Sequence, residues 1–293
     1  MLATAFLALV VLATIVTLPW TLSRTGENGT GPRTFEATHP VMALQSPSWV
    51  DPLGTDRLGR SLAARMLLGG GISLVVGVCA AGTALVLGTM WGMLAAMAGG
   101  RVDALAMRIV DVLYGLPSVL LVVVLAVALE GICERLSIES GTARMMLDLG
   151  ALFVAIGAVG WLTLARVVRG QMLSLKTRPF IDAARVAGVG RWRMIRRYYL
   201  PHLAGPVLAY TALIVPTAML AEAFLSFLGI GVREPLPSWG SLAASGLSEL
   251  NPVRFRWWLL VPPCVLIACT LVSLTVLGEA LRVRLDPRQA ESA

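Results

Sequence analysis

The sequence predicts an all-α membrane protein with about six transmembrane helices, and three observations lead to that fold class. Of its 293 residues, 57% are hydrophobic and only 14% are charged, whereas a soluble domain typically carries about 25% charged residues. The chain contains uncharged stretches long enough to cross a hydrocarbon core of about 30 Å as helices. It has no series of alternating segments of about ten residues, which membrane-spanning strands would require.

The first predicted span has the apolar character of a signal peptide. However, no positive charge precedes it and no clear small-residue cleavage site follows it, so we expect residues 1–18 to be a retained transmembrane helix. In chain order the predicted spans are Leu2–Leu18, Ile72–Ala98, Val112–Leu129, Leu149–Ala165, Leu203–Ala221 and Trp257–Gly278.

Residues 19–71, after the first span, are expected outside the cytoplasm and contain two kinds of sequence. The first half of this segment is expected to be irregular, because it contains Gly26, Asn28, Gly29, Gly31 and Pro32. After Pro52, Thr55 or Asp56 is able to cap a short helix. Its shared apolar face would consist of Leu58, Leu62 and Met66. We expect this amphipathic helix to lie at the outer membrane surface.

The second predicted span carries small residues at every fourth position. These residues are Ala80, Ala84, Gly88 and Gly92. Because residues at this spacing share one helix face, they predict close approach of another helix backbone.

Several spans contain proline, which membranes tolerate where neighbouring helices or cavity water satisfy the freed carbonyls. Repeated breaks suit helices that move, and simple packing kinks explain them equally well. The prolines are Pro117, Pro206, Pro216, Pro262 and Pro263.

Basic residues predict the orientation. The stretch Arg166–Arg197 holds nine Arg or Lys residues against one acid, Asp182. Since positive charge gathers on the cytoplasmic side, we expect this loop in the cytoplasm. With six spans both termini are then cytoplasmic, and the arginines of the tail 282–293 agree. Membrane orientation accounts for the net charge of +7, so no nucleic-acid partner is expected.

The segment Phe180–Leu203 is too polar to span the membrane, yet its residues are patterned. Ile181–Ala187 favours helix, and Gly188 and Gly190 interrupt it, as glycine does where a chain needs positive φ. We expect a second helix to follow. Its predicted apolar face consists of Trp192, Ile195 and Tyr199. The pattern suits either a projecting helix–turn–helix that carries force or a basic hairpin resting on anionic lipid.

This segment resembles the signature loop of ABC importer permeases, whose pattern is Glu-Ala-Ala, three residues, Gly, nine residues, Ile, one residue, Leu-Pro. The matching residues are Asp182, Ala183, Ala184, Gly188, Tyr198, Leu200 and Pro201. Asp and Tyr here replace the Glu and Ile of the pattern. Further stretches, Asp51–Ser61, Glu222–Gly240 and Leu277–Arg288, resemble the dipeptide, oligopeptide and nickel branch of those permeases.

The resemblance implies a type I ABC importer permease fold in the cell (inner) membrane. Residues 72–281 would form the permease core with five transmembrane helices, and loop 166–202 would dock as a coupling helix on a cytoplasmic ATPase. The implied partners are a second homologous permease, two ATPases, an extracytoplasmic solute-binding protein and membrane lipid. Peptides or similar small solutes are the implied cargo. The coupling residues would be Asp182, Ala183, Ala184, Arg185, Gly188, Leu200 and Pro201.

Glu222 is a carboxylate at membrane depth, where an unpaired charge costs a few kcal/mol. Such a residue predicts a functional site, and we expect Glu222 to line or gate the pathway near its outer end. The residues grouped with it are Phe224, Ser226 and Phe227. An interfacial residue at the helix end, or one that pairs with the partner permease, fits the sequence equally well.

No phosphate-binding loop of the form G-x-x-x-x-G-K-[ST] is present. The sequence also has no Ser/His/Asp or Cys/His spacing for catalysis or metal binding. We therefore expect no catalytic residue, metal or cofactor, and a transport subunit rather than an enzyme. A self-sufficient ion-coupled transporter or channel is the alternative, but its spans would need more ionisable groups than Glu222 and Asp111. A membrane scaffold would explain the helices but not the loop spacing.

Overall fold

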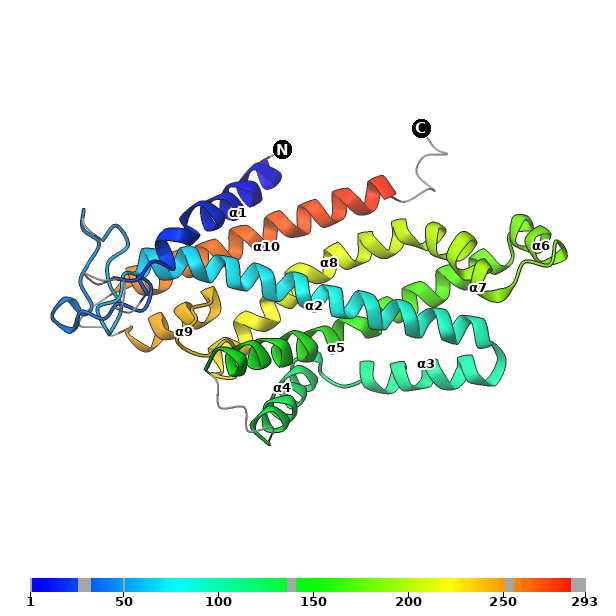
Figure 1. The fold of residues 1–293 in the computed structure, drawn as a ribbon, viewed down its shortest axis with the longest axis horizontal. Helices are drawn as coiled ribbons and strands as arrows, with labels where there is room; N and C mark the ends of the chain where they lie inside the picture. Colours follow the sequence, from blue (N-terminus) through cyan, green and yellow to red (C-terminus); the bar gives the residue numbers. More distant parts are fainter. Residues whose placement is uncertain (1, 26–32, 50, 136–140, 251–255, 286–293) are drawn as a thin grey trace.

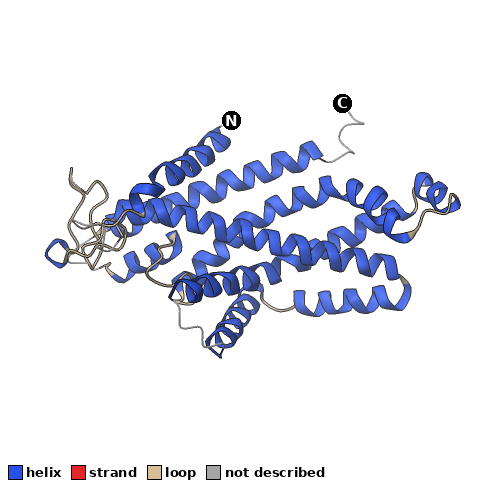
Figure 2. Ribbon diagram, viewed as in Figure 1, coloured by secondary structure: helices blue, strands red, loops and turns tan. Residues whose placement is uncertain are grey.

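The computed structural model describes residues 2–25, 33–49, 51–135, 141–250 and 256–285. Within these ranges the chain is helical and contains no strand (Figure 2). The all-α fold predicted from the sequence is confirmed. The segment after the first span, whose first half was expected to be irregular, contains only loops and one short 3-10 turn over residues 33–49, while residues 26–32 and the last residues of the tail lie outside the described residues.

Among the described residues, five helices are long and apolar enough to cross a membrane. These are α1 (Leu2–Thr21), α2 (Leu62–Ala98), α5 (Gly141–Lys176), α8 (Leu200–Phe227) and α10 (Trp257–Leu285). Counting α3 (Gly100–Tyr114) and α4 (Ser118–Arg135) together as one broken span gives a sixth. The shorter elements are η1 (Pro40–Met42), α6 (Pro179–Val186), α7 (Arg191–Met194), the π-helical turn η2 (Ile195–Tyr199) and α9 (Trp239–Ser248).

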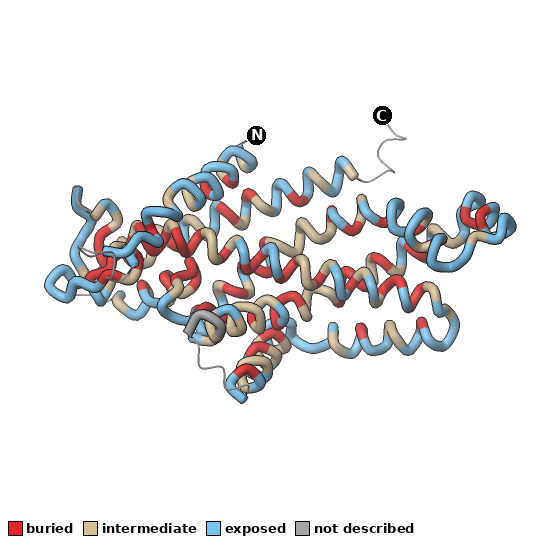
Figure 3. Tube along the Cα trace, viewed as in Figure 1, coloured by how far each residue is buried: buried red, intermediate tan, exposed pale blue. Residues whose placement is uncertain are grey.

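Helix α2 lies at the centre of the bundle and contacts α1, α3, α5, α8 and α9 (Figure 1). A Cβ atom added to Gly88 would lie 2.7 Å from Leu164 Cβ, and one added to Gly92 would lie 2.5 Å from the Ala165 carbonyl oxygen. The backbones of α2 and α5 are therefore too close for larger side chains. This confirms the close approach predicted from the small residues of the second span. Burial is concentrated along α2 and α5, whereas α1 is mostly exposed (Figure 3).

The third predicted span, Val112–Leu129, is not one straight helix. Helices α3 and α4 meet at an angle of 95°, with the break just before Pro117. Proline lacks the N–H that would continue the helix and disfavours helical geometry in the residue before it. The uncharged run therefore begins in one helix and ends in another.

The separate amphipathic helix expected after Pro52 is also corrected by the structure. Leu58 lies in a loop, and the helix begins at Leu62 and continues without a break to the end of α2. Leu62 and Met66 are buried against Trp239. The helix passes through a run of three glycines because the missing side chains leave room for its neighbours: a Cβ atom on Gly70 would lie 2.5 Å from the Trp239 ring.

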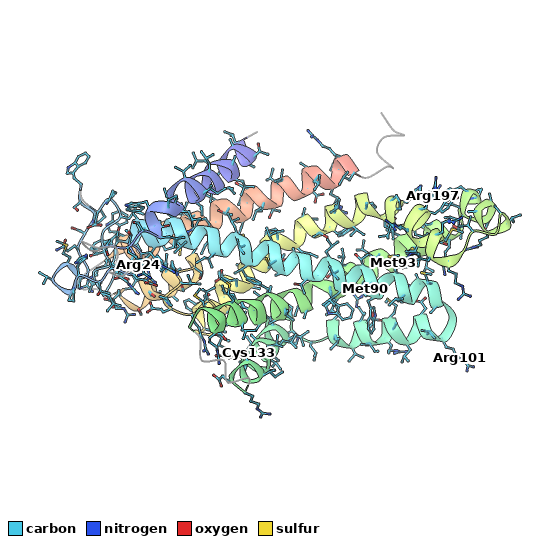
Figure 4. All side chains as sticks on the ribbon, in the orientation of Figure 1. Arg24, Met90, Met93, Arg101, Cys133 and Arg197 are labelled. Carbon is cyan, nitrogen blue, oxygen red and sulfur yellow. The ribbon has the colours of Figure 1, made fainter. Side chains whose placement is uncertain are left out.

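The molecule is elongated, with α6 at one end and the segment between α1 and α2 at the other (Figure 1). The N-terminal end of α1 and the C-terminal end of α10 both point toward the end of the molecule that carries α6. Arg101 and Arg197 lie toward the α6 end and Arg24 at the opposite end (Figure 4).

Candidate functional site

Helix α6 is held at its end of the molecule by apolar contacts. Ile181 and Ala184 are buried in a cluster with Met172 of α5, Met194 of α7 and Leu203 of α8. Pro179 occupies the first turn, where its missing N–H has no cost. The helix is short, and these contacts pack it directly onto two long helices.

A glycine turn ends α6. Gly188 has a φ of +75°, its N–H donates to the Arg185 carbonyl at 3.0 Å, and the Val189 N–H donates to the Ala184 carbonyl at 3.1 Å. These two bonds form the Schellman arrangement that satisfies the last carbonyls of a helix. The glycine turn predicted after this helix is therefore present at Gly188.

The outward face of α6 combines one ion pair with exposed apolar surface. Asp182 and Arg185 pair with each other, Oδ1 to Nη1, at 2.9 Å. Val186 is 90% exposed, and Ala183 is exposed beside it. Ala184 faces inward, so its small side chain serves the packing of α6 and is not available at the surface.

The second helix of the segment differs from the predicted one. Tyr199 is buried and Ile195 partly so, but Trp192 is 74% exposed. In the π-helical turn η2 each hydrogen bond spans five residues, instead of the four of an α-helix. The side chains on either side of this turn therefore do not share one face as they would on a continuous α-helix. Leu200 and Pro201 lie at the start of α8, which continues from this turn, and both are exposed.

Glu222 is only 1% exposed and lies inside the chain. Ser226 Oγ donates to one carboxylate oxygen at 2.7 Å, and Ser73 Oγ donates to the other at 3.2 Å. Ser73 Oγ also accepts the backbone N–H of Trp239 at 3.2 Å, and Ser226 Oγ lies 3.3 Å from Ser238 Oγ. The carboxylate thus connects α2, α8 and the beginning of α9, and in this conformation it is closed to a partner chain.

Helix α9 was not anticipated from the sequence. Its first turn is a capping box, in which Ser238 Oγ accepts from the Ser241 N–H at 3.1 Å and Ser241 Oγ accepts from the Ser238 N–H at 2.9 Å. In the sequence, Ser238 and Ser241 stand three residues apart on either side of Trp239 and Gly240, which is the spacing of a capping box. Trp239 is buried, and its indole N–H donates to the Met66 carbonyl oxygen at 2.9 Å.

A groove of about 710 Å³ lies between the α3–α4 break and helices α4, α5 and α8. Its walls are mostly apolar and include Tyr114, Leu116, Ile156, Thr217 and Phe224. Of the four residues that the sequence grouped as pathway residues, Phe224 lines this groove and Phe227 is exposed one turn further along α8. Glu222 and Ser226 are buried, so the structure does not bring the four together on one surface.

Sequence reasoning missed two ion pairs that attach α3 to α5. Arg169 Nη2 lies 2.7 Å from Asp103 Oδ2, and Arg166 Nη2 lies 2.8 Å from Asp111 Oδ1. The Arg166 guanidinium also lies 4.0 Å from the centre of the Tyr114 ring. The available signal was a pair of acidic residues, Asp103 and Asp111, in the segment before a strongly basic one.

Comparison with known proteins places these features in context. The family described as "Binding-protein-dependent transport system inner membrane component" matches residues 88–291. The chain is 38% identical, over 259 residues, to the oligopeptide transport system permease protein OppC of Haemophilus influenzae, covering 88% of this chain and 77% of that protein. It is 39% identical, over 235 residues, to the dipeptide transport system permease protein DppC of Bacillus subtilis, covering 80% of this chain and 68% of that protein.

A solved structure has the same fold. A chain of the MetNI methionine ABC transporter, in its inward-facing conformations, matches with a TM-score of 0.59 at 16% sequence identity. The match covers 77% of this chain and 98% of that chain. At this identity the likeness concerns the arrangement of the helices alone.

Proposed function

Since this chain belongs to the family of binding-protein-dependent transport system inner membrane components and is a multi-pass permease subunit of an ABC importer, we propose that it imports peptides. We propose further that a partner ATPase drives this transport by moving α6. The proposed cargo follows from relatives whose names state oligopeptide and dipeptide transport. The proposed drive follows from the geometry of the α6 end.

The observation that carries the coupling proposal is the outward face of α6. Val186 and Trp192 are large apolar side chains left exposed at the far end of the molecule, and exposed apolar groups on a projecting segment suit a protein partner. The cluster around Ile181 joins α6 to α5 and α8. Movement of a docked ATPase would therefore be transmitted directly to two long helices.

Within that face the residues have different proposed roles. Asp182, Ala183 and Arg185 would contact the ATPase, and Gly188 would set the turn that presents them. Ala184 would hold α6 against its own chain. Leu200 and Pro201 would begin the helix that receives the movement.

The assembly proposed for this subunit contains a second homologous permease, two ATPases on the α6 side and a solute-binding protein on the opposite side. The α6 side would be cytoplasmic, because exposed arginines gather there (Figure 4). The start of α1 and the end of α10 point the same way, so both termini are proposed to be cytoplasmic.

The groove beside Phe224 is proposed as this subunit's share of the translocation pathway. Its mixture of apolar walls and a few hydroxyls suits solutes of varied side chains. Glu222 and Ser226 would support this wall from behind by holding α8 against α2 and α9, and Phe227 would extend it toward the outer end.

The coupling proposal is tested by Val186→Asp, with Val41→Asp as the matched control. Both valines are at least 90% exposed, and they lie at opposite ends of the molecule. Val186→Asp is expected to reduce copurification of the ATPase and ATP-driven uptake of a peptide by about tenfold, because it places a charge in an apolar contact. Equal ATPase copurification with the two variants, or peptide transport by this chain alone without an ATPase, would overturn the proposal.

A further inference from the structure

A second cavity, of about 340 Å³, lies at the end of the molecule opposite α6. It is enclosed by the loop before α2, the beginning of α2, the loop between α8 and α9, and helices α9 and α10. Three leucines, Leu62, Leu242 and Leu259, form apolar walls. Charged residues of both signs surround them, so the cavity combines apolar and ionic surface.

Arg65 is an unusual member of this cavity because it is only 3% exposed and incompletely paired. Its Nε and Nη1 atoms have no hydrogen-bond partner among the described residues. The nearest carboxylate oxygens, of Glu234 and Asp56, lie at 3.5 and 3.9 Å. Arg60 takes the short bonds to the same two carboxylates, at 2.9 and 2.6 Å. A buried guanidinium normally has its N–H groups satisfied, so the acceptors around Arg65 are incomplete: two of its three nitrogen atoms have no hydrogen-bond partner in the described part of the chain, and the third lies 3.5 Å from Glu234.

Glu234 occupies the position that an incoming carboxylate would take. Its side chain is 65% exposed, whereas those of Arg60 and Arg65 are 10% and 4% exposed. A carboxylate on the open side of two buried guanidinium groups is able to swing into solvent without uncovering apolar surface. Asp56 is held differently, because the Arg60 backbone N–H also donates to it at 2.9 Å.

The α9 wall of the cavity carries a carboxylate that is already ion-paired. Glu249 stands at the end of α9 and pairs with Arg57 at 2.9 Å and Arg256 at 2.7 Å. Ser245, one turn earlier, is exposed and lines the same cavity. The cavity therefore offers two buried guanidinium groups on one wall, an ion-paired carboxylate on another, and leucines between them.

We propose that this cavity is an outer subsite for a short peptide with a free carboxylate. That carboxylate would replace Glu234 on Arg60 and Arg65, and an apolar side chain of the peptide would lie on the leucines. The volume is near the lower end of the range for small-molecule sites, about 300–1,000 Å³, which suits a peptide of few residues. A protein interface needs about 800 Å² from each partner, far more than this cavity presents. The inference rests on the proposed function, because it presumes peptide cargo.

The test measures equilibrium binding of radiolabelled leucyl-leucine to the assembled permease–ATPase complex in lipid nanodiscs, without a binding protein. Saturable binding is expected, and leucyl-leucine amide should compete about tenfold less well because it lacks the carboxylate. Glu234→Gln should strengthen binding by about threefold, since it removes the resident competitor.

A pair of variants on α9 tests the location. Ser245→Trp fills the cavity from an exposed position and should abolish binding, whereas Leu247→Trp, on an exposed position outside the cavity, should leave it unchanged. Equal competition by the amide, weaker binding to Glu234→Gln, or unchanged binding to Ser245→Trp would each overturn the subsite. Wild-type ATP-driven uptake, measured in parallel with a binding protein, separates the two proposals. Peptide uptake without direct binding would contradict the subsite alone. The absence of peptide uptake would contradict the proposed function.

Discussion

The two ends of the molecule attach a short helix by different physical means. Helix α6 is held by an apolar cluster and a glycine turn, and its N-cap residue, Arg178, makes no side-chain capping bond. Helix α9 is held by a capping box, by the Trp239 indole bond and by the hydroxyls around Glu222. Hydrogen bonds are directional and costly to leave unmade once buried, whereas apolar contact is non-directional. We infer that α9 is fixed in one position and that α6 is able to adjust to a moving partner.

Trp239→Ala makes the largest change to the α9 attachment. The substitution removes both the ring that packs on Gly70 and the bond to Met66, and a buried Trp→Ala change typically costs about 3–5 kcal/mol. Thermal unfolding of the purified complex should show a clearly lowered Tm. The fully exposed Trp49 supplies the control, and a Trp49→Ala variant of equal instability would contradict a rigid α9.

Glu222→Gln should have the next largest effect. The carboxylate accepts from two hydroxyls, but the amide offers an N–H₂ group in place of one acceptor. One hydroxyl must then reverse or stay unpaired, at a cost of about 1–3 kcal/mol. Hydrogen exchange at α9 should accelerate and peptide uptake should fall, with the complex still assembled. Unchanged hydrogen exchange and unchanged uptake would show that Glu222 does not help to hold α9.

Gly188→Ala probes the α6 end. A side chain at a φ of +75° costs about 1–2 kcal/mol, although no atom lies within 4 Å of the added methyl group. We expect less uptake per ATP hydrolysed with little change in Tm, because only the turn is strained. Gly190→Ala is the matched control, since Gly190 has equally open surroundings and a φ of −62°. Equal uptake by the two variants would contradict a coupling role for the turn.

The smallest expected effect is a pH dependence at the outer end. The hydrogen bond from Arg60 is the main cause that holds the pKa of Glu234 below its ordinary value. Because the folded pKa is the lower one, the pair stabilises the fold above the ordinary value of about 4.3 and loses this contribution as pH falls further.

Glu234 is largely exposed, so solvent screening limits the contribution to less than about 1 kcal/mol. The difference in Tm between wild type and Glu234→Gln should shrink as the pH falls below about 4. A difference that grows instead would show that the ion pair destabilises the outer end.

Local chemistry explains which parts of this molecule were predictable. The turn at Gly188 follows from one residue type and one helix end. The contact of α2 with α5 follows from Gly88 and Gly92, since small residues on one face allow close approach wherever the second helix comes from. The break near Pro117 was visible as a proline, but the angle between α3 and α4 was not, because it depends on what each half packs against.

By itself, the sequence determined the helical class, most of the spans and the basic segment with its turn, because these depend on residue composition and on bonds between near neighbours. Only the tertiary structure decided that Glu222 is enclosed by hydroxyls from α2 and α8, that Trp192 points outward, and that Arg65 lacks an acceptor. Those outcomes depend on which distant segments meet. The sequence shows which residues carry a carboxylate or a guanidinium group. It does not show whether that group will face a hydroxyl, a second charge or an empty cavity.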